Sequence, residues 1–348
     1  MILVAFGTRP EIIKLFPVIN ALRQRGIPTQ TLFTGQHLDL FHDVKELIPE
    51  PDFRFGEENS RRSTPETLGA SFVRICSTTE KLFATHHFNF VVVQGDTTTA
   101  WALAQMAFYS NIPVAHVEAG LRTFDLQNPY PEELNRTLIT HVAELNFAPT
   151  EQATENLRQA GARNIHCVGN TIVDSVAHIQ KTNGFVPEYS NKVLITIHRR
   201  ENHRLLPDIF DEITTAANLH PELDFIFPIH PNPNVQAHRE RLTAPNIHVV
   251  APVSYPEMLR LIATARFIIS DSGGIQEEAT CFNKKILIMR EKTERPETVA
   301  VGLGRLVGKN IQAHLAWALS PPPANVRSPY GLGDSSVKIA ETLQNHCQ

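Results

Sequence analysis

The chain has 348 residues, of which 42% are hydrophobic and 20% are charged, so it falls in the ordinary globular range with material for about two domains. Its formal net charge is −4 and it has no long run of lysine and arginine, so it lacks the basic footprint of a nucleic-acid-binding protein. No apolar stretch reaches the roughly 18 residues of a transmembrane helix. The apolar run at 2–6 is too short for a secretory signal and no basic segment precedes it. We therefore expect a cytoplasmic protein with neither a nucleic-acid nor a membrane partner.

The four cysteines are far apart in the chain and form no CxxC pair: Cys76, Cys167, Cys281 and Cys347. Structural zinc sites need closely spaced ligands, and disulfide frameworks are typical of small secreted domains. We expect four inert buried thiols in a reducing cytosol, and no metal site.

Short apolar runs alternate with segments of helical period along the whole chain, which is typical of βα units around a parallel sheet. The first series of runs lies at 2–6, 31–34, 90–94, 113–117, 145–148 and 165–168, and the second at 192–197, 224–229, 247–250, 266–270 and 285–289. The pattern predicts an α/β protein with two doubly wound Rossmann-like domains and an interdomain cleft. The predicted ranges are 1–170, 171–333 and a terminal helix at 334–348 that packs back on the first domain, with a linker at 181–191.

Ligands of such sheets bind beyond the carboxyl ends of the strands, so the residues after each run are the candidates for a site. After the first run, Thr8 and Glu11 have the spacing of a capping box, which makes Glu11 a cap rather than a catalyst. Arg9 lies in the first helical turn, where backbone N–H groups already favour an anion, and could bind phosphate or be simply exposed. Lys14 lies off the apolar stripe, where a solvated lysine is the usual interpretation.

Three carboxylates follow the next strands of the first domain. Asp96 and Glu118 each stand beside a glycine at a strand end, and Glu132 begins a predicted helix. Asp96 could merely cap the next helix, and Glu132 could merely pair with Arg136 at i,i+4. Two carboxylates at adjacent strand ends nevertheless favour acid–base chemistry, because that chemistry needs groups held rigidly toward one cavity.

The second domain has polar groups at corresponding places. His198 and His230 follow two of its strands, and His198 precedes two arginines, which suggests the lining of a cleft for a phosphorylated ligand. The segment 271–279 predicts a strand end, a turn of small residues and a helix start. Bare amides at such a helix N-terminus would hold a diphosphate and an acid one turn later would accept from ribose hydroxyls, although a plain tight turn is the alternative.

Taken together, these segments resemble the non-hydrolysing UDP-N-acetylglucosamine 2-epimerases, which share a two-domain, GT-B-like architecture with one large class of glycosyltransferases. The resemblance extends along nearly the whole chain. It rests on eight motifs in order: Phe6-Gly-Thr-Arg-Pro-Glu11, Gln94-Gly-Asp-Thr-Thr-Thr99, His116-Val-Glu-Ala-Gly-Leu-Arg122, Pro131-Glu-Glu133, Val168-Gly-Asn-Thr171, His198-Arg-Arg-Glu201, Asp271-Ser-Gly-Gly-Ile-Gln-Glu-Glu278 and Thr293-Glu-Arg-Pro-Glu297.

The resemblance implies inversion at carbon 2 of UDP-N-acetylglucosamine, by anti elimination of UDP to 2-acetamidoglucal and re-addition. It implies no cofactor, a UDP-sugar as the small-molecule partner and a homodimer. Carried over by position, the acid–base carboxylates are Asp96, Glu118 and Glu132, with His198, Arg9 and Lys14 in the catalytic set. The substrate-binding set is Arg9, His198, Ser272, Gly273, Gly274, Glu278 and Arg295.

Three departures from the family pattern leave details open. Ile197 stands where a glycine is common, and Gln94 where a histidine is frequent; both flank the proposed site, so the choice between gluco- and galacto-configured substrate stays open. The segment 36–42 keeps Gln-His and then diverges. In many bacterial relatives this region helps form a second site where substrate acts as activator, a regulation that we do not expect here.

Two other enzyme types use similar features. A glycosyltransferase of the same layout would not need three clustered carboxylates in its first domain. A hydrolysing epimerase usually has Gly-Thr-Arg-Ala-Asp in place of the early Gly-Thr-Arg-Pro-Glu motif at 7–11. The sequence therefore favours the non-hydrolysing epimerase over both, and over a sugar-nucleotide binder without activity.

Overall fold

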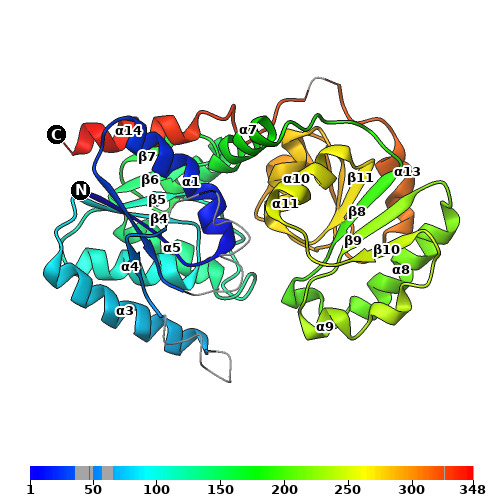
Figure 1. Cartoon of the computed structure of the whole chain (residues 1–348), viewed down its shortest axis with the longest axis horizontal. Coiled ribbons are helices and arrows are strands. Elements are labelled where there is room, and N and C mark those ends of the chain that lie inside the picture. The colour runs from blue at the N-terminus through cyan, green and yellow to red at the C-terminus, as the bar shows by residue number, and fades with distance from the viewer. Residues whose placement is uncertain (36–46, 48–49, 57–65, 325, 348) are drawn as a thin grey trace. The chain divides into compact units, whose positions relative to one another are not determined.

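The structure is a computed structural model that describes residues 1–35, 47, 50–56, 66–324 and 326–347 (Figure 1). The segment 36–42, on which the expectation about substrate activation depends, lies outside the described residues. The chain forms two compact units, the first made of Met1–Ser175 and Tyr330–Gln348 and the second of Val176–Pro329. Each unit has one parallel sheet flanked by helices, as the alternation of apolar runs predicted.

The sheet of the first unit has the strand order β3-β2-β1-β4-β5-β6-β7, and all neighbouring pairs are parallel. Six of these strands coincide with predicted apolar runs. The two-residue strand β3 was not predicted, because it is too short to show a periodicity. The bounds are β1 Ile2–Phe6, β2 Thr29–Phe33, β3 Phe53–Arg54, β4 Phe90–Gln94, β5 Val114–Val117, β6 Leu145–Ala148 and β7 Ile165–Cys167.

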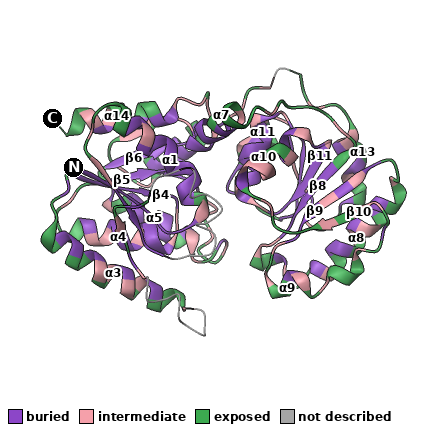
Figure 2. Ribbon diagram, in the orientation of Figure 1, coloured by how far each residue is buried: buried purple, intermediate pink, exposed green. Residues whose placement is uncertain are grey.

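Helices bury both faces of the central part of this sheet, where the strands β4, β5 and β6 are purple in Figure 2. Alternate residues such as Leu3 and Ala5 pack with α3, α4 and α5 in one core cluster, so the residues between them face the opposite layer. The helices of the unit are α1 Arg9–Gln24, α3 Leu68–Thr85, α4 Thr98–Tyr109, α5 Glu132–Val142, α6 Glu151–Gln159 and α14 Ser335–His346. The helix α7 Thr171–Asn183 begins in the first unit and continues into the second.

The sheet of the second unit has the order β10-β9-β8-β11-β12-β13, again parallel throughout. Its strands are β8 Lys192–Thr196, β9 Asp224–Pro228, β10 Ile247–Val250, β11 Phe267–Ser270, β12 Ile286–Ile288 and β13 Gly304–Leu306. The short β13 was not predicted. The helices are α8 Leu206–Leu219, α9 Pro233–Gln236, α10 Tyr255–Thr264, α11 Gly273–Cys281, α12 Pro296–Ala300 and α13 Leu315–Leu319, with 3-10 turns at Arg200–Asn202, Arg239–Arg241 and Gln312–His314.

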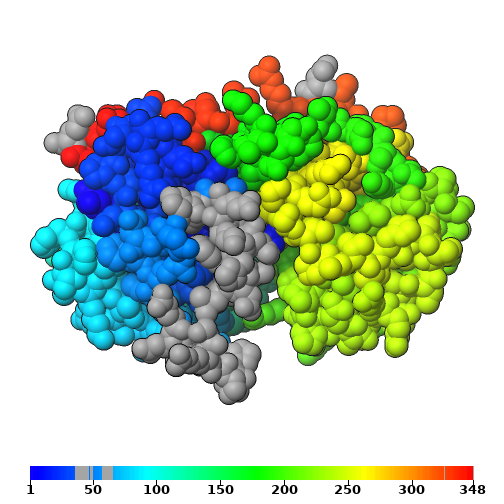
Figure 3. Space-filling view, in the orientation of Figure 1, coloured from blue at the N-terminus to red at the C-terminus, as the bar shows by residue number. Residues whose placement is uncertain are grey.

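The C-terminal helix α14 packs on α1 of the first unit, and Figure 3 shows its red atoms against the blue N-terminal segment. Arg25, the C-cap of α1, forms an ion pair with Glu341 on α14. Asp174, in the first turn of α7, accepts hydrogen bonds from the backbone N–H and the hydroxyl of Ser336, at 2.9 and 2.5 Å. The first turn of α7 is therefore fixed to the first unit, which runs to Ser175 where the sequence placed a boundary at 170.

All four cysteines are free thiols, but the expectation that they are buried is wrong. Cys167 and Cys347 are exposed, and Cys76 and Cys281 are partly buried. Both exposed residues lie next to element ends, where apolar periodicity says little about the facing side. Among the helices that the structure describes, none has the length and apolar character to cross a membrane.

Candidate functional site

Asp96 and Glu118 lie in the turns that follow the neighbouring strands β4 and β5. These strands pair in register, with Gln94 opposite Val117, so both carboxylates are brought to one edge of the sheet. Glu118 has a φ of 63°, in the left-handed region that non-glycine residues rarely adopt. Such strain persists where the surrounding structure imposes it, which is common at functional sites.

The carboxylate of Glu118 forms an ion pair with Lys14, which comes from the second turn of α1. Lys14 Nζ donates to Glu118 Oε2, and each side chain is only 6% exposed. The interpretation of Lys14 as a solvated lysine is therefore wrong, because α1 is buried well beyond its apolar stripe. Asn170 Nδ2 donates to the same oxygen of Glu118 at 3.2 Å. Sequence reasoning missed Asn170, although it lies within the motif at 168–171.

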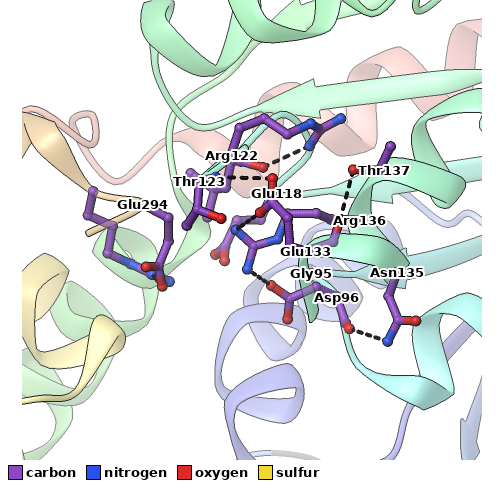
Figure 4. A network of polar contacts seen from close by, with 12 residues as sticks. Gly95, Asp96, Glu118, Arg122, Thr123, Glu133, Asn135, Arg136, Thr137 and Glu294 are labelled. Carbon is purple, nitrogen blue, oxygen red and sulfur yellow. Dashed lines mark hydrogen bonds and ion pairs between the residues drawn. The ribbon is translucent and has the colours of Figure 1, made fainter. Parts of the chain in front are cut away.

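Asp96 does not cap the following helix. Thr97 caps α4 instead, since its hydroxyl accepts a hydrogen bond from the backbone N–H of Ala100 at 3.0 Å. The Asp96 carboxylate forms an ion pair with Arg136, whose other terminal nitrogen lies 3.4 Å from Glu133 Oε2 (Figure 4). The side chain of Asp96 is 24% exposed, so it is accessible to a proton donor or acceptor while Arg136 holds it in place.

Glu132 is the first residue of α5 and is partly buried, whereas its neighbour Glu133 is fully buried. Oε1 of Glu133 accepts from the backbone N–H groups of Thr123 and Phe124, at 3.1 and 3.0 Å. Glu133 therefore holds the chain that follows β5 against α5 (Figure 4). The sequence did not distinguish these two adjacent glutamates, because only tertiary contacts separate their environments.

His116 of β5 also holds the turn that bears Asp96. His116 Nε2 lies 2.7 Å from the carbonyl oxygen of Gly95, which can only accept, so Nε2 carries the proton. Burial lowers the pKa of His116 to about 4, and the ring is therefore neutral at physiological pH. His116 acts as a fixed hydrogen-bond donor to the turn and not as a proton shuttle.

The predicted capping box at the start of α1 is confirmed. Glu11 Oε2 accepts from the backbone N–H groups of Gly7 and Thr8, at 3.0 and 2.8 Å, and its Oε1 accepts from the hydroxyl of Thr97 at 2.7 Å. Glu11 thus joins the first turn of α1, which begins at Arg9, to the turn beside Asp96. Burial raises the pKa of Glu11 to about 7, although its hydrogen bonds oppose that shift.

We expect the Glu11→Gln variant to lose one pH-dependent contribution to stability. A carboxyl whose pKa is raised from 4.5 to about 7 by folding stabilises the native state below pH 4.5, and this stabilisation is lost as the pH rises through about 7. The full change is about 3 kcal/mol, since one pKa unit corresponds to about 1.4 kcal/mol. In urea unfolding at pH 4.5, 6 and 8, the free energy of unfolding of the variant should increase relative to that of the wild type as the pH rises. Parallel pH profiles of the two proteins would contradict the prediction.

In the second unit, Asp271 organises the loop that carries His198. Its carboxylate is fully buried and accepts from the backbone N–H groups of His198 and Arg199, at 3.0 and 2.9 Å, and from Asn202 Nδ2 at 3.1 Å. The ring of His198 stacks on that of His230 with centroids 5.3 Å apart. The His198 side chain is 37% exposed, so a ligand can reach it.

The predicted helix start after β11 is confirmed, with Ser272 as the N-cap and Gly273 as the first residue of α11. A Cβ at Gly273 would stand 2.5 Å from Arg295 Nη1, so the guanidinium of Arg295 would have to shift away from its present position. A Cβ at Gly274 would meet no described atom within 4 Å. Packing therefore does not require glycine at 274, but the close approach of a ligand to the backbone would.

Arg295 packs against Gly273, and Glu278 lies in α11 after this turn. Arg295 is buried and pairs with Glu277 at 2.6 Å and with Glu294, so the contacts given by the structure tie its guanidinium to the protein. Glu278 accepts a hydrogen bond from the hydroxyl of Tyr255 at 2.8 Å. Among the described residues, no group of three or more His, Cys, Asp or Glu side chains is placed to hold a metal ion.

Comparison with known proteins identifies relatives of this chain in sequence and in fold. The family model described as UDP-N-acetylglucosamine 2-epimerase matches residues 20–344. A Campylobacter jejuni UDP-N-acetylglucosamine 2-epimerase is 38% identical over 376 residues, which cover 98% of this chain and 97% of the relative. The solved structure of the Neisseria meningitidis UDP-GlcNAc 2-epimerase bound to UDP-GlcNAc has a TM-score of 0.88 and 33% identity, covering 99% of both chains. That of the Methanocaldococcus jannaschii enzyme in complex with UDP-GlcNAc and UDP has a TM-score of 0.86 and 34% identity, again covering 99% of both.

Proposed function

Because the chain belongs to the UDP-N-acetylglucosamine 2-epimerase family, we propose that it interconverts UDP-N-acetylglucosamine and UDP-N-acetylmannosamine. The product would supply a sugar nucleotide for cell-surface polysaccharide. One observation carries this proposal: Glu118, in a buried pair with Lys14, and Asp96 follow two neighbouring strands of a rigid sheet. The two carboxylates can therefore serve proton transfer at one place.

The weak acidity of the proton on carbon 2 dictates the route. The proton on carbon 2 is poorly acidic, since no carbonyl stands next to it, so simple deprotonation is disfavoured. In the proposed route a carboxylate removes this proton while the bond from carbon 1 to the UDP oxygen breaks on the opposite side, giving 2-acetamidoglucal and UDP. A carboxylic acid then delivers a proton to the other face of carbon 2, and UDP adds back to carbon 1. The candidates for the two acid–base roles are Asp96, Glu118 and Glu132.

Expulsion of UDP places new negative charge on the leaving diphosphate. Cations and N–H donors located there stabilise the transition state more than the ground state. We assign this task to Arg9 and His198, with Lys14 as a supporting cation, and to the amides after Ser272. Glu278 would hold the ribose and Arg295 would shape the nucleotide pocket from beneath Gly273. The proton chemistry thus falls to the first unit and most of the nucleotide binding to the second.

Substitutions at the two glycines separate packing from ligand binding. We expect Gly274→Ala to fold normally, because the new methyl meets no described atom, yet to bind UDP about tenfold more weakly, which corresponds to about 1.4 kcal/mol. Gly273→Ala should instead destabilise the unit, because the methyl displaces Arg295 from its ion pairs. Calorimetric titration with UDP, together with thermal unfolding, distinguishes the two variants. Unchanged UDP affinity in the folded Gly274→Ala protein would mean that this turn does not bind the diphosphate.

We infer a homodimer in the cytoplasm. Phe108 and Tyr109, the last two residues of α4, are apolar side chains with 54% and 66% exposure, as expected where a second copy covers the surface. The four free thiols suit a reducing compartment. Light scattering of the wild type and of a Phe108→Glu, Tyr109→Glu variant tests the dimer, which the paired charges should dissociate.

Incubation with UDP-N-acetylglucosamine in heavy water tests the proposed reaction. Deuterium should replace the proton on carbon 2 while UDP-N-acetylmannosamine builds to a constant ratio. Release of free N-acetylmannosamine would show a hydrolysing enzyme instead. If neither occurs, the same assay with UDP-N-acetylgalactosamine tests the other sugar configuration, and silence with both substrates would favour a glycosyltransferase.

A further inference from the structure

Asn170 is fixed so that it can only donate toward Glu118. Its Oδ1 accepts a hydrogen bond from the backbone N–H of Ile172 at 3.0 Å, which identifies that atom as the oxygen of the amide. The amide nitrogen must then face Glu118 Oε2, 3.2 Å away. The Asn170 side chain is buried, and its backbone N–H donates to the carbonyl of Tyr330 at 2.7 Å. The residue is therefore held at both its backbone and its side chain.

The C-terminal segment packs closely on the loop that carries Asn170. A Cβ at Gly169 would lie 2.6 Å from the hydroxyl oxygen of Ser335 and 3.0 Å from the carbonyl of Tyr330, both in the returning C-terminal segment. Gly169 also has a φ of 93°, which favours glycine. The C-terminal segment thus clamps the loop that presents Asn170 to Glu118, although it is more than 150 residues away in sequence.

The neutral amide of Asn170 can orient the Glu118 carboxylate in a way that the charged groups around it do not. Lys14 of α1 supplies the positive charge. Arg122 donates to the carbonyl of Leu121 and the hydroxyl of Thr140, and His116 to the carbonyl of Gly95, so both are engaged elsewhere. A lysine side chain is a point charge on a flexible stem and does not define the plane of a carboxylate, whereas a second donor from another direction does.

We propose that Asn170 is a positioning residue for the epimerase reaction, which holds the Glu118 carboxylate in one orientation for proton transfer at carbon 2. This inference rests on the proposed function. Donation to a carboxylate also favours its ionised form. Removing the donor therefore affects both the geometry and the protonation of Glu118, while it leaves the nucleotide-binding residues of the second unit unchanged.

Asn170 also caps α7, so its role in orienting Glu118 must be separated from this structural role. Two substitutions of Asn170 do so. Asn170→Ser keeps a side-chain oxygen for the backbone N–H of Ile172 but is too short to reach Glu118. Asn170→Asp keeps the size and the cap, and places a carboxylate against Glu118. Asp174→Asn is the matched control: Asp174 lies in the same turn of α7 and binds Ser336 of α14, but its contacts are not with Glu118.

The full-length variants are compared for deuterium exchange at carbon 2, for kcat and KM across pH and for UDP affinity. We expect kcat to fall about 10- to 100-fold in Asn170→Ser, by analogy with the loss of a hydrogen-bond partner that orients a metal ligand, and further in Asn170→Asp. The pH-profile limb that belongs to Glu118 should move up by at least about one pH unit in Asn170→Asp, because two adjacent carboxylates resist joint ionisation. UDP affinity should stay at the wild-type value, circular dichroism should show every variant folded, and Asp174→Asn should keep the wild-type rate.

Wild-type exchange with an unchanged rate and pH profile in the folded Asn170 variants would overturn the inference alone. An equal loss of rate in Asp174→Asn would also overturn it, since the effect would then come from the docking of α14. Absence of exchange in the wild type would overturn the proposed function and this inference together.

Discussion

Replacing Glu118 by Gln is expected to lower kcat by about 100- to 10,000-fold, the range for loss of a general acid or base. Glutamine has the shape of glutamate and can still accept from Lys14, so the turn after β5 should keep its conformation. It cannot take up or release a proton at physiological pH. Deuterium exchange at carbon 2 should therefore fall with kcat, while UDP affinity stays near that of the wild type.

An exposed carboxylate provides the control for Glu118→Gln. Glu155 lies on α6 of the same unit with a side chain that is 49% exposed, and its partner Arg158 is 60% exposed. Glu155→Gln should leave the exchange rate unchanged. Circular dichroism must show both variants folded. Exchange at the wild-type rate in folded Glu118→Gln would mean that Glu118 does not transfer the proton, and that Asp96 and Glu132 form the acid–base pair.

Replacing Lys14 by Met is expected to have the largest effect on stability. The substitution leaves the Glu118 carboxylate buried without its cation, and breaking one partner of a buried ion pair costs about 3–5 kcal/mol. Asn170 remains as a donor, but a neutral hydrogen bond offsets only part of the loss of a charge. Urea unfolding at pH 7.5 measures the free energy of unfolding of the variant against that of the wild type.

A second substitution and a surface control show whether the pair is the cause. In the double variant Lys14→Met, Glu118→Gln no charge stays buried at this position, so most of the lost stability should return. The pair of Lys338 and Asp334 has side chains that are 46% exposed, and Lys338→Met should change stability by less than about 1 kcal/mol. Additive losses in the double variant would mean that Lys14 and Glu118 do not interact in solution.

The lysine shows where reasoning from sequence reaches its limit. The stripe of apolar residues on α1 identifies a helix with one buried face and leaves Lys14 outside that face. In the structure α14 also packs on α1, and the turn after β5 meets Lys14. Both contacts come from more than 100 residues away, and helical period carries no information about a second covering element.

Features decided by neighbours in the chain could be read from the sequence itself. The parallel sheets follow from apolar runs of strand length between helical segments, because a strand buried on both faces needs continuous apolar residues. The capping box of Thr8 and Glu11 and the start of α11 at Gly273 follow from spacing, because caps form within one turn. The placement of Asp96 and Glu118 at one sheet edge follows from the rule that parallel strands end on the same side.

Only the tertiary structure decided which partner each polar side chain has. Arg136 reaches Asp96 across 40 positions, Asn170 reaches Glu118 across 52, and Glu11 reaches Thr97 across 86. Such pairs are set by which strand lies beside which and by how helices pack on the sheet. The sequence by itself therefore determined the architecture and the candidate carboxylates, whereas folding determined how each carboxylate is oriented and charged, because that depends on burial and on donors far away in the chain.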